Sequence, residues 1–401
     1  MSDLLTLKRI REDLNSYKVN KEVALKTLEV IINESENEEI RAEAIELIGE
    51  IALKTEIVFK LLEKSLVSDE SPLVRFSAAK VIIKNFITHE HSPLLWAIEN
   101  ENSIFFFKQI LDLLKKLTEE NKEINEIRRR SRERVMGLYK LNLEDAKFIL
   151  DIDFIEYLRF RKEFKNFLEK FSVKEAHIKD LVKENTEIGY KGLGRIQSSK
   201  QGYITALNLA DLDAIPESLS SLTRLESLSI NRCRLKKIPD LSSRIQNLKH
   251  LNLSDNELEE LPKWVFDFSR MKKNHQKYLN QGVIPSEAPI LALLEMLTNN
   301  EILKSSDFLK TIQKYGYYFC IDKNGYIRGL YIKHPKKPKM GIIPKQICEL
   351  NNIEELYFIN QNIKKIPVCI NRLKKLKILD LRENELNLIP KSIKKLEILR
   401  L

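Results

Sequence analysis

No run in this sequence of 401 residues is apolar enough to cross a bilayer. Its longest strongly apolar stretch, residues 103–114, is interrupted by Lys108, whereas a membrane helix needs about 20 apolar residues. Residues 1–13 carry charges where a signal peptide needs an apolar core. These absences predict a chain without a membrane span and a cytoplasmic location.

Cysteine is also scarce, because the chain holds four cysteines and no CxxC pair. They lie in segments with an apolar pattern, which is typical of buried free thiols in a reducing compartment. Neither a disulfide nor a zinc site is therefore expected. The four residues are Cys233, Cys320, Cys348 and Cys369.

Motifs that carry chemistry are missing as well. The sequence has no GxxxxGKS or GxxxxGKT phosphate loop, no HExxH zinc motif and no serine nucleophile elbow. The triplet of His89, Glu90 and His91 has no further ligand at a recognisable spacing. We therefore expect no cofactor, no metal and no enzymatic activity.

Positive charge is concentrated at one end of the chain. The sequence has 68 Lys and Arg against 58 Asp and Glu, an excess of 10. Residues 321–401 hold 18 basic and 8 acidic residues, so they carry the whole excess and residues 1–320 are formally neutral. Attraction to an acidic partner is therefore expected at the C-terminal end.

The first part of the chain has the periodicity of paired amphipathic helices. Apolar side chains recur at helical spacing in residues 40–51, and the pattern returns 34 residues later in residues 74–82, with Arg75 in the place of Arg41. A weaker copy without the arginine covers residues 106–117. The pattern resembles HEAT repeats, whose helix pairs stack because one pair alone cannot bury its apolar face.

The residues that follow, 119–188, stay helical but lose this repeat. Five arginines in residues 128–134 are a candidate contact for nucleic acid or an acidic lipid surface. Because Glu123, Glu126 and Glu133 are close by, we favour a solvated helix face instead.

A different period begins at Gly202. Three segments each combine an LxL strand pattern, a turn and a final proline, and after an interruption three more segments repeat the pattern. Within each group the prolines are 23 residues apart. They are Pro216, Pro239, Pro262, Pro344, Pro367 and Pro390.

This pattern is identified as that of leucine-rich repeats of the 23-residue intracellular signalling type. LxL forms a strand whose alternate side chains enter the core, and a polar residue after it bridges neighbouring coils. The resemblance implies ladder residues at Cys233, Asn256, Gln361 and Asn384. The interruption of about 55 residues is too long for a plain loop, so it should form a small helical unit.

The predicted fold is therefore an N-terminal α-solenoid followed by an α/β leucine-rich-repeat solenoid in two blocks. Each block starts with a nearly identical segment, GYITALNL or GYIRGLYI, whose glycine should close a hairpin. The expected domains are HEAT-like repeats in 1–118, a helical connector in 119–188, the first leucine-rich block in 189–270, a helical insertion in 271–316 and the second block with its capping hairpin in 317–401.

The strands of such a solenoid line a concave face, on which the residues between the leucines point outward. In the second block these include tyrosine and isoleucine among cations, a composition typical of interfaces. We predict a non-catalytic scaffold for protein partners in signalling, and the repeat type implies a small GTPase as one candidate. The predicted partner-binding residues are Arg328, Tyr331, Lys333, Tyr357, Ile359, Lys377 and Arg382.

Two alternatives stay open. The basic C-terminal block could bind nucleic acid or an anionic surface. Cys320 and Asp322 form a CxD pattern similar to that of bacterial leucine-rich-repeat ubiquitin ligases, although Cys320 precedes a hairpin turn and has no histidine near in sequence. Residues 396–401 begin another strand without a polar cap, so either self-association or a sequence that is truncated here is also predicted.

Overall fold

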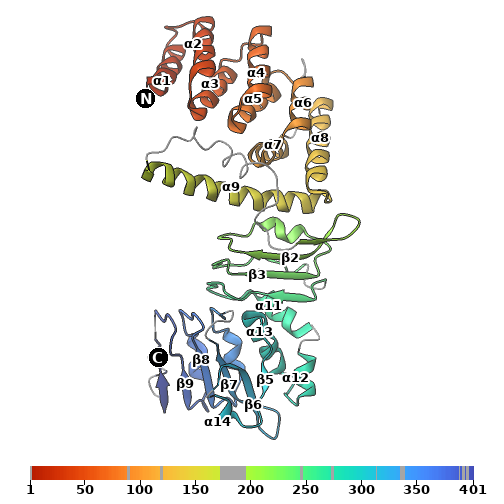
Figure 1. Cartoon of the computed structure of the whole chain (residues 1–401), viewed down its shortest axis with the longest axis vertical. Helices are drawn as coiled ribbons and strands as arrows, with labels where there is room; N and C mark the ends of the chain where they lie inside the picture. Colours follow the sequence, from red (N-terminus) through yellow and green to blue (C-terminus); the bar gives the residue numbers. More distant parts are fainter. Residues whose placement is uncertain are drawn as a thin grey trace. The chain divides into compact units, whose positions relative to one another are not determined.

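The computed structural model divides into two compact units, Met1–Gly192 and Leu193–Leu401 (Figure 1). It describes residues 2–87, 91–117, 121–171, 196–243, 247–271, 275–312, 314–334, 339–387, 389–390, 393 and 397–401. Of the His89, Glu90 and His91 triplet, His89 and Glu90 lie outside these ranges.

The described part of the N-terminal unit is a stack of helices. Most of them begin after an Asn, Ser or Thr whose side-chain oxygen accepts a hydrogen bond from the first turn, as at Asn20 and Ser103. The predicted apolar stripes meet in one core, where Ile48, Ile82 and Phe106 are buried together. The helices are α1 (Ser2–Asn15), α2 (Lys21–Glu34), α3 (Glu38–Ile51), α4 (Glu56–Ser68), α5 (Pro72–Asn85), α6 (Ser92–Asn100), α7 (Ile104–Lys116), α8 (Lys122–Tyr139) and α9 (Leu143–Phe171).

The two arginines singled out by the repeat make equivalent contacts. Arg41 donates to both carboxylate oxygens of Asp69, over 3.0 and 2.8 Å, and to the carbonyl oxygen of Ser35. Arg75 donates in the same way to Glu101, over 2.8 and 3.0 Å, and to the carbonyl oxygen of Asp69. Each guanidinium thus ties the turn before its own helix to the turn before the next repeat, which fixes the stacking of consecutive pairs.

The arginine run lies on α8 and is paired with acidic side chains. Arg129 contacts Glu126 and Glu133, and Arg130 contacts Glu126 and, over 3.1 Å, Glu99. The two guanidinium groups lower the pKa of Glu126 to about 2 by hydrogen bonding to its charged form. This segment is therefore an ion-paired, solvated helix face, as the neighbouring glutamates predict.

The described residues of the C-terminal unit form two β-sheets, one for each leucine-rich block. The LxL strands pair in parallel with their leucines in register, so Leu207 lies opposite Leu228 and Leu330 opposite Leu356. The four-stranded sheet of the first block has the order β1 (Ile196–Ser198), β2 (Ile204–Ala210), β3 (Ser227–Asn231) and β4 (His250–Asn252). The six-stranded sheet of the second block has the order β10 (Ile398–Arg400), β9 (Ile378–Asp380), β8 (Glu355–Ile359), β7 (Ile327–Lys333), β6 (Gly316–Ile321) and β5 (Leu303–Lys304). Short 3-10 turns follow three of the prolines: η2 (Glu217–Ser221), η3 (Lys345–Glu349) and η4 (Val368–Arg372).

Each block does start with a hairpin. Strand β1 pairs antiparallel with β2, and β6 pairs antiparallel with β7. Gly202 and Gly325 sit in the turns with φ angles of 75° and 85°, the left-handed region that glycine adopts without strain. The hairpin partner covers the outer edge of the first parallel strand in each block, which leaves that edge unavailable for other pairing.

The insertion is helical, as predicted, but its first helix begins at Lys263 and it is joined to both blocks. It contains α11 (Lys263–Met271), α12 (Gln276–Asn280), α13 (Ala288–Thr298) and α14 (Phe308–Thr311) (Figure 1). The backbone N–H of Leu253, just after β4, donates to the carbonyl oxygen of Met296 in α13 over 2.9 Å. Strand β5 adds to the other sheet beside β6. The insertion therefore links the two blocks instead of forming a separate body.

The insertion also predicts a pH effect on stability. Glu287, at the start of α13, is 3% exposed and accepts a hydrogen bond of 2.6 Å from the backbone N–H of Ile327. Burial raises the pKa of its carboxyl to about 7 from 4.5, so the folded chain keeps a proton that the unfolded chain releases in this range. Stability contributed by the protonated form is therefore lost as pH rises from about 4.5 to about 7.

We expect Glu287→Gln, which is neutral and keeps an acceptor oxygen, to be about 1–2 kcal/mol more stable than wild type at about pH 8 and closer to it at about pH 5. Urea unfolding at both pH values measures this difference. An equal difference in unfolding free energy between the variant and the wild type at both pH values would contradict this prediction.

Candidate protein-binding surface

The predicted ladder positions bridge neighbouring coils. Asn256 donates through Nδ2 to the carbonyl oxygen of Ile230 over 2.8 Å, and Asn384 donates likewise to Phe358 over 2.6 Å. Cys233 lies 3.6 Å from the carbonyl oxygen of Leu209. Gln361 differs, because its amide nitrogen bonds the carbonyl oxygens of its own coil and its Oε1 accepts from the N–H of Met340 over 3.2 Å.

The two blocks meet on this ladder side. The N–H of Lys339 donates to a carboxylate oxygen of Asp255 over 2.5 Å, and the N–H of Asp255 donates to the carbonyl oxygen of Lys339 over 2.8 Å. Next to this pair, the N–H of Gly341 donates to the carbonyl oxygen of Gln361 over 2.9 Å. Residues 339–341 therefore continue the ladder from one block to the next, although the two sheets are separate.

The predicted exposure of the concave face is wrong at three positions. Tyr331, Tyr357 and Ile359 do lie side by side, but they are 2%, 5% and 3% exposed. Phe308 and Ile312, from and just after α14, pack on them together with other partly buried side chains. The tyrosine hydroxyl groups are also satisfied internally, since Tyr331 donates to the carbonyl oxygen of Lys314 over 2.8 Å. The insertion therefore turns this row of side chains into a local core.

A new surface lies over that core. Leu309 of α14 is 68% exposed and Tyr315, before β6, is 59% exposed. The ammonium group of Lys333 lies 5.4 Å from the centre of the Tyr315 ring, a cation–π contact. We call these three side chains, Leu309 on α14 and the contacting pair of Tyr315 and Lys333, the insertion face.

The other predicted cations lie in or near the parallel strands of the second block: Arg328 is in β7, Lys377 precedes β9 and Arg382 follows it. Arg328 and Lys377 flank Glu354, and the Lys377 ion pair is 2.9 Å long. Arg382 forms an ion pair of 2.7 Å with the carboxylate of Asp380, and this aspartate is fully buried. All of these cations keep part of their side chains in solvent: Arg328 is 32%, Lys377 53% and Arg382 49% exposed.

Sequence reasoning missed the insertion face because the insertion lacks the repeat that made the strands recognisable. A signal does exist in the sequence, since Phe308 and Ile312 are four residues apart and so share one helix face. Only the tertiary contacts show that this face closes over Tyr331 and Tyr357.

Cys320 is poorly suited to act as a nucleophile. It lies on β6, and burial raises the pKa of its thiol to about 11. The neighbouring carboxylate of Asp322 is engaged in the hairpin turn, where it accepts from the N–H groups of Asn324 and Tyr326 over 2.9 and 3.1 Å. The structure therefore gives no support to the ligase alternative.

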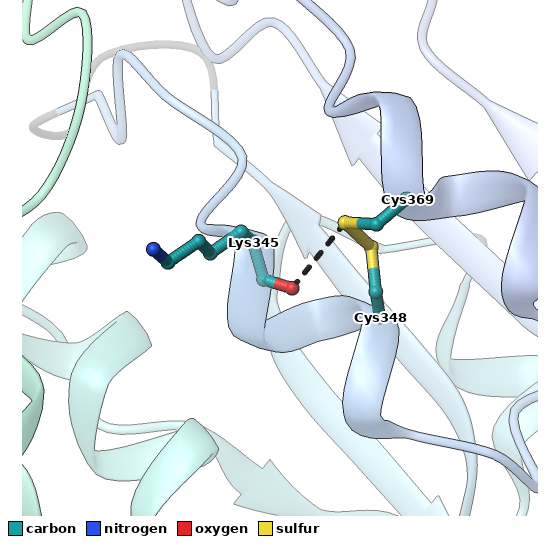
Figure 2. Close-up of a disulfide and its surroundings, with 3 residues drawn as sticks. All are labelled: Lys345, Cys348 and Cys369. Atoms are coloured by element: carbon teal, nitrogen blue, oxygen red, sulfur yellow. Dashed lines mark hydrogen bonds between the residues drawn. A yellow bond between two sulfur atoms is a disulfide. The ribbon is translucent and has the colours of Figure 1, made fainter.

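The expectation of four free thiols is wrong for two of them. Cys348 and Cys369 form a disulfide, while Cys233 and Cys320 are free. The pair lies in η3 and η4, the turns after successive prolines, with 5.8 Å between the Cα atoms, and Figure 2 shows the sulfur atoms beside the carbonyl oxygen of Lys345. The sequence lacked a signal because the two cysteines are 21 residues apart and only the stacking of two coils brings them together.

This disulfide should stabilise the second block measurably. Closing a loop of this length is worth about 3 kcal/mol, so dithiothreitol should lower the melting temperature of the wild type but not of the Cys348→Ser, Cys369→Ser double variant. Titration of the denatured chain without reductant should count two thiols, Cys233 and Cys320. A count of all four cysteines of the sequence would contradict the bond.

The basic character of the C-terminal block is partly neutralised locally. Lys364 pairs with Glu257 over 2.7 Å, and Lys377 pairs with Glu354. Lys336, Lys337, Lys394 and Lys395 lie outside the described residues. Within the described ranges, no group of three His, Cys, Asp or Glu side chains is placed to hold a metal ion.

Comparison with known proteins identifies the repeats. Residues 223–264 match a model of two leucine-rich-repeat copies, and residues 375–396 match a single leucine-rich repeat. A leucine-rich-repeat protein of Leptospira interrogans with a solved structure is 22% identical over 48% of this chain and 47% of its own, with a TM-score of 0.19.

Curated relatives share part of the sequence. The volume-regulated anion channel subunit LRRC8E of Xenopus tropicalis is 27% identical over 49% of this chain, and the human subunit LRRC8B is 25% identical over 58%. A probable serine/threonine-protein kinase, pats1 of Dictyostelium discoideum, is 28% identical over 48%. The chain spans only 24%, 31% and 6% of the lengths of these three proteins.

The relatives' names describe a channel and a kinase, and none of the three names a GTPase as a partner. No helix among the described residues is long and apolar enough to cross a membrane. Leucine-rich repeats generally mediate protein–protein contacts and are generally non-catalytic. The chain therefore carries leucine-rich repeats in its C-terminal unit and stacked helices in its N-terminal unit.

Proposed function

We propose that the chain is a non-catalytic scaffold that binds a protein partner through the insertion face. Two exposed apolar side chains carry the proposal: Leu309, on the helix whose Phe308 packs on the buried tyrosines, and Tyr315, whose ring contacts the Lys333 ammonium group. Exposed apolar side chains held on a rigid base lose little conformational freedom on binding, which favours them as anchors of an interface.

The charge of the surroundings indicates the kind of partner. Lys333 lies beside Tyr315, Lys377 and Arg382 stay about half exposed in the same block, and residues 321–401 carry the entire positive excess of the chain. A partner with an apolar knob rimmed by acidic side chains would complement this surface. The small GTPase suggested by the repeat type is one candidate for such a partner.

A pull-down from cells of the source organism, followed by binding of the purified partner, tests the proposal. Leu309→Asp combined with Tyr315→Ala should weaken binding of that partner about tenfold or more, because it removes both anchors. Val368→Asp is the matched control, since Val368 is 77% exposed in η4 and far from the insertion face in sequence. Equal binding by the double variant and the control would contradict the proposal.

A nucleic acid as the partner would give a different result. Binding would then fall steeply with salt and depend on lysines across the C-terminal block, while Leu309→Asp with Tyr315→Ala would leave it intact.

A further inference from the structure

A polar hollow lies at the joint between the two leucine-rich blocks, away from the insertion face. It has a volume of about 710 Å³ and lies where the strands end. The residue that follows each ladder position lines it in four coils: Arg234, Glu257, Asn362 and Glu385. Asn299, the C-cap residue of α13, adds to the lining. We call this site the joint hollow.

The joint hollow exists because the insertion interrupts the array. On the ladder side, residues 339–341 keep the blocks in contact, as the bonds between Lys339 and Asp255 show. On the strand side, α13 follows β4 where another strand would otherwise continue the sheet. The regular row of post-ladder side chains therefore surrounds a recess at this place.

Several polar groups in the joint hollow are available to a ligand. Within the described residues, the Arg234 guanidinium and the side chains of Asn299, Asn362 and Glu385 have no hydrogen-bond or ion-pair partner. Ser254, which also lines the hollow, is 1% exposed and its buried hydroxyl oxygen has no partner in the part of the chain that the structure describes. A buried hydroxyl without a partner is costly, so a bound ligand that supplies one gains affinity.

Other charges of the hollow are already paired. Arg232 contacts Asp211 over 3.5 Å, and Lys364 contacts Glu257 over 2.7 Å. Arg234 forms no ion pair within the described residues, although the hydrogen bond from Lys364 and, to a smaller extent, the Arg234 charge lower the pKa of Glu257. Its fork of donors suits a carboxylate.

The lining restricts the class of ligand. It contains no aromatic side chain, so a nucleobase or a sugar ring would find no stacking partner. Acidic residues outnumber basic ones, which disfavours a ligand with several negative charges, such as a polyphosphate, more than a ligand with one carboxylate. Asparagine side chains offer a donor and an acceptor together, the pair that a peptide group needs.

We propose that the joint hollow binds a short extended peptide segment whose acidic side chain meets Arg234. The amides of Asn299 and Asn362 bond the peptide backbone, and Ser254 receives a hydrogen bond from it or donates one to it. This site goes beyond the proposed function, because it lies on different residues from the insertion face.

An array of immobilised degenerate octapeptides tests the inference with the purified full-length chain. One set fixes Glu or Asp at a central position, and matched sets fix Gln or Lys there. We expect binding to the acidic set only, followed by fluorescence polarisation of the best peptide to obtain its Kd. Absence of binding to the acidic set, or equal binding to the lysine set, would overturn the proposal.

Variants then locate the binding site. Arg234→Glu should weaken binding of the acidic peptide about tenfold or more, because it replaces a charge-assisted hydrogen bond with repulsion. Asn362→Gly should weaken binding less, and glycine tolerates the positive φ of 55° at this position. Lys237→Glu is the matched control, because Lys237 is exposed in the same coil and does not line the hollow. Unchanged binding by Arg234→Glu would overturn the site.

The insertion-face variant separates this inference from the proposed function. The Leu309→Asp, Tyr315→Ala double variant should bind the acidic peptide as well as the wild type does. The insertion-face proposal and the joint-hollow proposal can therefore fail independently. Loss of peptide binding in that double variant would place the peptide on the insertion face and overturn the joint hollow.

Discussion

Gly341→Val should destabilise the C-terminal unit by about 3 kcal/mol, one of the two largest effects expected in this chain. Gly341 has a φ of 72°, and a Cβ added to it would lie 2.2 Å from the carbonyl oxygen of Asn256. Because the clashing atom belongs to the backbone, no side-chain rotation relieves the clash. Valine also adopts this positive φ only with strain. The ladder contact between the two blocks should therefore open.

Differential scanning calorimetry measures this loss, because residues 1–192 and 193–401 form separate compact units. Only the transition of the C-terminal unit should move. Gly137→Ala is the control, since nothing lies within 4 Å of a Cβ added there and the residue is in α8. A Gly341→Val chain with wild-type transitions would show that the blocks do not meet at this glycine.

Tyr331→Ala should cost about 3–5 kcal/mol of folding free energy, the other large effect. The ring is buried between neighbours, with ring centres at 5.7 Å for Tyr357 and 6.3 Å for Tyr318. Removing it leaves a cavity under α14 that the surrounding strands cannot fill. Tyr331→Phe should cost only about 1 kcal/mol, because it loses the hydroxyl bond to Lys314 and keeps the ring.

Tyr315→Ala is the matched comparison, since this tyrosine is 59% exposed. Its effect on denaturant unfolding should stay within about 0.5 kcal/mol. If Tyr331→Ala were equally mild, Tyr331 would be a surface residue and the strand row would be open to partners.

The repetitive parts of the fold could be predicted from the sequence because their signals are local. The LxL strands, the prolines and the two glycine turns each specify a conformation within a few residues, and stacking follows from burying one face per repeat. The equivalent contacts of Arg41 and Arg75 follow from the same periodicity.

The functional surface was harder to predict because it depends on contacts between segments far apart in the sequence. The strand pattern correctly predicts that Tyr357 points away from the repeat core, yet Phe308 packs on it. The same applies to Cys348 and Cys369, which meet only because two coils stack in register. Periodicity specifies which face a side chain occupies, and it does not specify what packs on that face.

Tyrosine nitration of the native full-length chain, with peptide mass spectrometry, tests the central claim that the insertion supplies the exposed surface of the second block. The account predicts rapid modification of Tyr315 and protection of Tyr331 and Tyr357, which are 2% and 5% exposed. Rapid modification of Tyr331 and Tyr357 in the folded chain would contradict it.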